Sequence, residues 1–306
     1  MNVVKSAHSI STITHNGVVY DTNAAKAELF VDQFQEISSD NNLTTDFMAH
    51  RVAFAAQHRD VIYGAPVPTS EQDDITVDTD DAAADATINQ PINNSFEMHE
   101  LVEPVRLCKN NSSPGADRIT NEIIKKIPKR NLSTIRKFYN LIWKKGKLSA
   151  SWKESIITPS LKPSKSAFDP TSYRSIALTS VLCKIMKRMI AARLRWFMEE
   201  QQLFNKFQSG FRKQRSCIGQ IMRPADDVHK SVNNNLYTLS VMIESKRAFE
   251  LVWHDGLLFK MTQLGLDGNI FKWVKDFLTD RTIQVLVGTE LFSVRRWKIE
   301  HHKEVS

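Results

Sequence analysis

The spacing of apolar and polar positions predicts a chain built mainly of helices. Ala27, Phe30, Val31 and Phe34 recur at helical spacing, and Asn23 is suited to cap the helix that they define. A long apolar stripe predicts another helix that starts near residues 179–180 and reaches Phe197. The same periodicity predicts further helices over residues 96–108, 119–127, 132–143, 254–266 and 270–278.

Three other segments have the composition of β-strands. Ser155–Leu161 contains Pro159, which lacks a backbone N–H, so we expect at best an edge strand or a hairpin arm. Tyr237–Ile243 is rich in β-branched and aromatic residues and predicts a buried strand. Thr282–Val287 and the residues after Gly288 predict a hairpin. Helices and short strands together indicate the α+β class.

Charge is distributed very unevenly along the 306 residues. The net charge is +7, but residues 1–105 carry −13 and residues 106–306 carry +20. Between Asp60 and Glu103 there are 11 acidic residues and no Lys or Arg, which predicts a flexible acidic leader that ends near residue 95. The basic portion favours a polyanionic partner, with a solvated basic surface as the alternative.

Several classes of protein are excluded by composition. No apolar run approaches the ~18 residues of a membrane span, and the polar N-terminus does not resemble a secretory signal. Cys108, Cys183 and Cys217 are too widely spaced for a disulfide framework or a zinc site. We therefore expect an intracellular protein of the nucleus or cytoplasm.

Some charged residues lie where chemistry or ligand binding is common. Glu244 follows the predicted strand Tyr237–Ile243, and a carboxylate at a strand end often holds a divalent cation, although a helix cap or a salt bridge is an alternative role. Basic side chains in segments rich in Pro and Gly are suited to contact phosphates or to remain solvated. They are Lys162, Lys165, Arg174 and Arg212.

Six sequence blocks occur in a fixed order along the chain. They are SPGADRI (113–119), WKESIITPSLKPSK (152–165), YRSIALTSVLCKIMKRMIAARL (173–194), QSGFRKQRSC (208–217), VMIESKRAFELVWHDGLLFKM (241–261) and FLTDRTIQVLVG (277–288). Over residues 96–295 the chain resembles the reverse transcriptase of non-LTR retrotransposons, particularly jockey-like LINE elements.

The resemblance implies a domain organisation and a reaction. It implies a right-hand polymerase with fingers over 96–235 and an incomplete palm over 236–306, preceded by the acidic leader over 1–95. The implied activity is RNA-directed DNA synthesis, in which a primer 3′-hydroxyl attacks a dNTP with the help of Mg²⁺. The implied partners are an RNA template, a DNA primer and dNTPs.

The resemblance also implies roles for individual residues. Arg174 and Arg212 match arginines expected near template or nucleotide phosphates, and Phe249 matches the aromatic residue that excludes a ribose 2′-hydroxyl. A template-contacting fingers segment corresponds to Gln208, Gly210 and Phe211. Glu244 matches the first metal-binding aspartate.

The sequence departs from the family pattern at several positions. Glu244 and Glu250 replace aspartates, and one added methylene displaces a carboxylate by ~1 Å, a misplacement that costs ~10²-fold in rate. Ser175 replaces proline, Lys187 replaces an acid, and the PQG and YADD blocks are not found. We therefore expect a fragment that is inactive by itself. The alternatives are a non-catalytic RNA-binding module and an unstable genomic relic.

Overall fold

The computed structural model describes residues 10–64, 90–245 and 248–296. The chain folds as two compact units, one made of Met1–Met189 and Phe249–Ser306 and the other of Ile190–Ala248. Helices and short strands are both present, so the α+β class is confirmed. Within the described ranges, no helix is both long and apolar enough to cross a membrane.

The first unit contains most of the regular structure. Its strands are β1 Ile13–His15, β2 Val18–Tyr20, β3 Glu154–Leu161, β4 Tyr173–Leu178, β5 Thr282–Val287 and β6 Glu290–Arg296. Its α-helices are α1 Asn23–Ile37, α2 Thr45–Gln57, α3 Arg59–Tyr63, α4 Gln90–Asn93, α5 Met98–Arg106, α6 Asn121–Lys125, α7 Lys129–Lys145, α8 Ala150–Lys153, α11 His254–Gln263 and α12 Gly268–Leu278. Asp40–Asn42 (η1) and Pro170–Ser172 (η2) are 3₁₀ turns, and helix α9, Val181–Glu200, begins in this unit.

A four-stranded sheet in the order β4-β3-β5-β6 organises the first unit. Strand β3 is antiparallel to β4 and parallel to β5, while β5 and β6 form the predicted hairpin, which is confirmed. Gly288 at its turn has φ +63°, a left-handed conformation that favours glycine. Of the two roles expected for Ser155–Leu161, the edge strand is wrong, because β3 lies between two neighbours, whereas the hairpin arm is confirmed, because β3 pairs antiparallel with β4, the next strand along the chain. Pairing with β5 ends at Ile157, however, so Pro159 lies beyond it and removes no hydrogen bond from that side.

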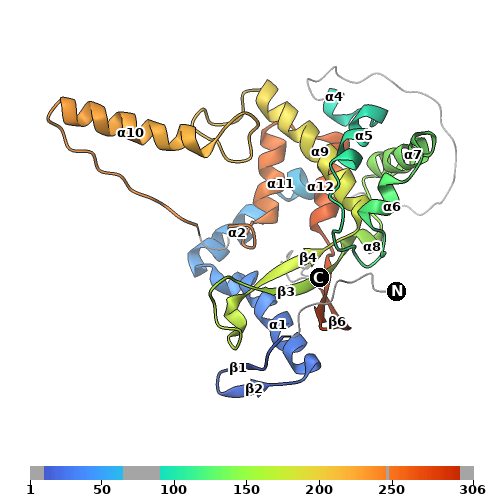
Figure 1. Cartoon of the computed structure of the whole chain (residues 1–306). Coiled ribbons are helices and arrows are strands. Elements are labelled where there is room, and N and C mark those ends of the chain that lie inside the picture. The colour runs from blue at the N-terminus through green and yellow to red at the C-terminus, as the bar shows by residue number, and fades with distance from the viewer. Residues whose placement is uncertain (1–9, 65–89, 246–247, 297–306) are drawn as a thin grey trace. The chain divides into compact units, whose positions relative to one another are not determined.

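Helix α1 covers the sheet and supplies much of its core (Figure 1). The predicted apolar face is confirmed, because Ala27, Phe30, Val31 and Phe34 are all buried. The Phe30 ring meets Tyr173 of β4 edge to face, with 5.0 Å between ring centroids. The cap is Thr22 rather than Asn23, because the Thr22 hydroxyl accepts a hydrogen bond from the backbone N–H of Ala25.

A second hydrophobic layer forms where α7 packs against α5 and α12. Tyr139 and Trp143 on α7 are buried, and the polar atom of each side chain donates a hydrogen bond. The Tyr139 hydroxyl donates to the carbonyl of Leu182 over 2.9 Å, and the Trp143 indole N–H donates to the carbonyl of Asn93 over 3.0 Å. These bonds satisfy polar atoms that would otherwise be buried at a cost.

The start of α9 is held close to the loop of the SPGADRI block. A Cβ added at Gly115 would lie 2.5 Å from the backbone nitrogen of Ser180. The glycine is therefore required for this close approach of two backbones.

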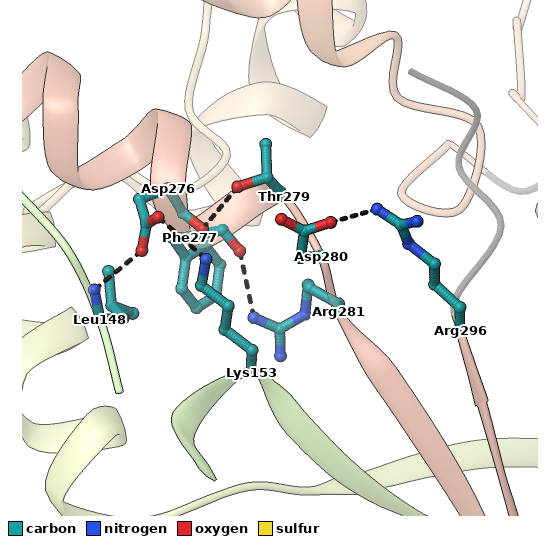
Figure 2. A network of polar contacts seen from close by, with 8 residues as sticks. All are labelled: Leu148, Lys153, Asp276, Phe277, Thr279, Asp280, Arg281 and Arg296. Carbon is teal, nitrogen blue, oxygen red and sulfur yellow. Dashed lines mark hydrogen bonds and ion pairs between the residues drawn. The ribbon is translucent and has the colours of Figure 1, made fainter. Parts of the chain in front are cut away.

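A polar network joins the end of α12 to the segment that leads into β3 (Figure 2). Asp276 accepts hydrogen bonds from the backbone N–H of Leu148 over 2.8 Å and from Lys153 Nζ over 2.9 Å. Arg281 donates to the carbonyl of Phe277 over 3.2 Å, and Asp280 pairs with Arg296 of β6. The network therefore links segments that lie far apart in the sequence.

In the described part of the second unit, the complete helix is α10, Cys217–Asn233. The end of α9, Ile190–Glu200, leads into an irregular loop over 201–216, and an extended stretch over 234–245 follows α10. The hydroxyl of Ser216 caps α10 by accepting a hydrogen bond from the backbone N–H of Gly219 over 3.4 Å.

The predicted strand Tyr237–Ile243 is wrong. Tyr237 and Met242 are 103% and 94% exposed, and the segment is neither strand nor helix. Among the described residues of Ile190–Ala248 there is no other strand to supply hydrogen bonds. A lone extended segment does not form a stable strand, whatever its side-chain propensities.

The structural units do not coincide with the predicted division at residues 95 and 235. The helix α1 from the predicted leader shares one core with β3, β4 and β5. The functional division into leader (1–95), fingers (96–235) and partial palm (236–306) stays a prediction. Most of the proposed acidic linker, 65–89, lies outside the described residues.

Candidate nucleic-acid interface

Arg212 organises the loop over 201–216 in the second unit. Its Nε and Nη2 donate to the two carboxylate oxygens of Glu199 over 2.9 and 2.6 Å. Its Nη1 donates to the carbonyls of Asn205 and Gln208 over 3.2 and 3.4 Å, and the guanidinium lies 4.9 Å from the centre of the Phe204 ring. The loop is therefore folded around this arginine and tied to the end of α9.

The bidentate ion pair shifts the pKa values of both Glu199 and Arg212. Hydrogen bonding from Arg212 lowers the pKa of the Glu199 carboxyl, and the same hydrogen bond raises the pKa of the Arg212 guanidinium. Each shift favours the charged form of its group, as expected for an ion pair.

The predicted template-contacting residues lie on the same loop. The Gln208 side-chain amide donates to the carbonyl of Gly210 over 3.3 Å, which holds the turn. Phe211 is 82% exposed and has φ +62°, an uncommon conformation for a bulky residue. The structure therefore brings Gln208, Gly210, Phe211 and Arg212 together on one loop.

An open hollow of about 500 Å³ lies between this loop and the end of α9. It is lined by Ala192, Arg195, Trp196, Glu199, Arg212, Lys213, Gln214 and Arg215. Four cationic side chains and one carboxylate give it a positive lining. Sequence reasoning did not single out Arg195, Trp196, Lys213 or Arg215, although the run of basic residues after Phe211 is a visible signal.

Lys162, Lys165 and Arg174 lie in the first unit, at one end of the β3–β4 pair. Arg174 is exposed on β4 opposite Ser160, and Lys165 is exposed in the connection between the strands. Lys162 Nζ donates to the carbonyl of Thr171 over 2.8 Å, which joins the two ends of the loop that connects β3 to β4. The three cations form a second basic group.

The two remaining predicted site residues belong to different units. Glu244 is exposed on the extended stretch of the second unit, whereas Phe249 belongs to the first unit and is 78% exposed. Over the described part of the chain, no three His, Cys, Asp or Glu side chains gather to hold a metal ion. The carboxylates that the structure describes therefore do not fit a polymerase magnesium site.

Comparison with known proteins agrees with the sequence blocks. Residues 161–303 match the family described as reverse transcriptase (RNA-dependent DNA polymerase). The chain is 31% identical over 199 residues to the RNA-directed DNA polymerase from mobile element jockey of Drosophila melanogaster, an alignment that covers 65% of this chain. The corresponding jockey protein of Drosophila funebris is 30% identical over 61% of this chain.

A third relative, "Probable RNA-directed DNA polymerase from transposon BS" of Drosophila melanogaster, is 32% identical over 192 residues, or 63% of this chain. The aligned part of the chain spans only about a fifth of the length of these relatives, 20–21%. The family match begins at Leu161, the last residue of β3, and runs through the basic loop and the β5–β6 hairpin. The chain therefore carries a segment of a reverse transcriptase that is similar to the polymerases of jockey and related mobile elements, and it aligns with only part of such a polymerase.

Proposed function

We propose that this chain is the portion of a retrotransposon polymerase that holds the RNA template and its DNA primer, in the nucleus or cytoplasm. The observation that carries the proposal is the basic loop over 201–216, which lies within the reverse transcriptase match and presents cations around an open hollow. The net charge of +20 over residues 106–306 supports the same partner class, because phosphate contacts dominate affinity for nucleic acids.

In the complete polymerase, the reaction would be template-directed addition of dNTPs to the primer. Polymerases of this family use divalent metal ions to hold the reacting phosphate and hydroxyl groups. The described residues of this chain do not fit such a site, because Glu244 stands exposed on an irregular stretch. We therefore assign template binding to this chain, and Mg²⁺ and dNTP chemistry to the whole polymerase.

Binding of single-stranded RNA by the full chain tests this function. A labelled RNA of about 12 nucleotides is titrated at salt concentrations from about 50 to 200 mM. Affinity should fall steeply with salt, with a slope of about −0.7 in log K against log [salt] for each phosphate contacted. Absent binding, or binding that salt does not weaken, would contradict the proposal.

Primer extension tests the assignment of catalysis. The purified chain should not extend a primer on an RNA template with dNTPs and Mg²⁺, while the same preparation binds the RNA. Magnesium-dependent extension that Glu244→Ala abolishes would show that this chain carries the catalytic site.

A further inference from the structure

The cations of the hollow differ in what their side chains already bind. The five N–H donors of an arginine form a rigid fork. In Arg212 the donors at Nε, Nη1 and Nη2 all reach acceptors of the protein itself: Glu199 and the carbonyls of Asn205 and Gln208. These bonds use four of the five N–H groups, so a phosphate that binds the arginine fork in bidentate fashion would have to displace at least one of them.

The other cations face the hollow without such bonds. Within the described residues, the side chains of Arg195, Lys213 and Arg215 make no hydrogen bond or ion pair. Lys213 and Arg215 are also exposed. Arg195 lies one helical turn before Glu199 on α9. Arg215 also acts on the Glu199 charge, but this single carboxylate offsets only one of the four cations, so the hollow keeps an excess of positive charge.

The size and lining of the hollow suit a nucleotide. A volume of about 500 Å³ falls within the range of small-molecule sites. Trp196 lines it and is 47% exposed, so its ring offers a face on which a base can stack. Cations beside an exposed aromatic ring are the usual combination for binding single strands without sequence preference.

We propose that this hollow binds a nucleotide unit of a single-stranded nucleic acid. Arg195, Lys213 and Arg215 contact the phosphates and Trp196 stacks on a base. Arg212 is a positioning residue that folds the loop against Glu199, instead of the phosphate ligand that its family position implies. The inference rests on the proposed template-binding function and names the residues that perform it.

The salt dependence of RNA binding separates phosphate contacts from other effects. In the assay above, Lys213→Ala, Arg215→Ala and Arg195→Ala should each weaken binding and reduce the salt slope by about 0.7. Trp196→Ala should weaken binding about 5- to 100-fold with the slope unchanged, because stacking releases no counterions. Lys230→Ala is the matched control: it removes one positive charge from the exposed surface of α10, outside the hollow, and should leave the slope unchanged.

Exchanging the partners of the ion pair tests the role of Arg212. Arg212→Glu alone should disrupt the loop and weaken binding, and the double variant Glu199→Arg with Arg212→Glu should restore most of the affinity. If Arg212 contacts a phosphate instead, the exchange will not restore binding. Thermal melting followed by circular dichroism shows that each variant is folded.

The outcomes distinguish this inference from the proposed function. If wild type binds RNA with strong salt dependence but the three cation variants behave like Lys230→Ala, the hollow is not the site and template binding stands. If wild type does not bind RNA at any salt concentration, the proposed function itself fails. Displacement of the RNA by micromolar nucleoside triphosphate would instead identify a site for free nucleotides and overturn the assignment to a strand.

Discussion

Helices α1 and α10 both carry an apolar stripe, which is buried on α1 and exposed on α10. The apolar face of α1 is buried against a sheet of four strands in the first unit. In the second unit no residue of α10 is buried, and its apolar positions Ile218, Ile221 and Met222 are between 65% and 69% exposed. A hydrophobic stripe therefore shows that a helix has an apolar face, but it does not show that the same chain covers this face.

The two units consequently divide stability and recognition between them. The first unit holds most of the buried apolar side chains and the polar network around Asp276. The second presents the basic hollow and a loop that depends on one ion pair. This division predicts that substitutions in the first unit mainly change the free energy of unfolding, whereas those in the second mainly change RNA affinity.

The largest effect is expected from Phe30→Ala. This ring is fully buried and contacts Phe34 and Tyr173, so its removal should lower the free energy of unfolding by about 3–5 kcal/mol. Ile221→Ala on α10 is the control and should change the free energy of unfolding by less than about 0.5 kcal/mol. Denaturant titration of both variants measures the difference, and equal losses would break the comparison between α1 and α10.

Asp276→Asn should have the next largest effect. The amide cannot replace a carboxylate that holds both the Lys153 ammonium and the Leu148 N–H, so a partly buried lysine loses its counter-charge (Figure 2). We expect a loss of about 3 kcal/mol in the free energy of unfolding. A loss no larger than that of Asp226→Asn, which affects an exposed pair on α10, would show that the network does not stabilise the first unit.

Lys187 is a site where a substitution should increase stability. Its ammonium lies 5.3 Å from the centre of the Phe277 ring, on which Arg281 also packs at 4.6 Å. Burial lowers the pKa of Lys187, and the nearby cations Arg281, Lys184 and Arg188 lower it further. Lys187→Glu places a carboxylate among these cations and should raise the free energy of unfolding by about 1–2 kcal/mol. Lower stability than wild type would contradict this interpretation.

The lowered pKa of Lys187 also predicts a pH dependence. The folded state binds the proton more weakly than the unfolded state, so stability rises with pH above the folded pKa until the ordinary value of about 10.4 is passed. Lys187→Met should therefore exceed wild type in stability at neutral pH, and this advantage should shrink as pH rises toward about 10.4. An advantage that does not change with pH would mean that the ammonium is not penalised by burial.

Local structure was predictable from the sequence, and non-local pairing was not. The spacing of Phe30, Val31 and Phe34 is enough to locate α1, and the residues around Gly288 are enough to locate the β5–β6 hairpin. The parallel pairing of β3 with β5 joins segments that are distant in the sequence, and no local pattern encodes it. The propensity of Tyr237–Ile243 for a strand failed for the same reason, because a strand also needs a neighbour.

In the candidate site, too, contacts between distant residues were not predictable from the sequence. Sequence blocks identified Arg212 and its loop, but not that Glu199, 13 residues earlier, occupies the arginine fork. Arg195 and Trp196 were missed because on a helix they read as ordinary surface positions, and only the fold of the loop places them opposite Lys213 and Arg215. The position of a charged residue was predictable, whereas its partner depended on how the chain folds back.

Hydrogen exchange of the full chain, with and without single-stranded RNA at low salt, tests the central claim most directly. Bound RNA should slow exchange of backbone amides over residues 192–216 and leave α1 and β5 unchanged, because the proposed contacts lie on the second unit. Protection confined to α1 and the sheet, or none at saturating RNA, would contradict the assignment of template binding to this loop.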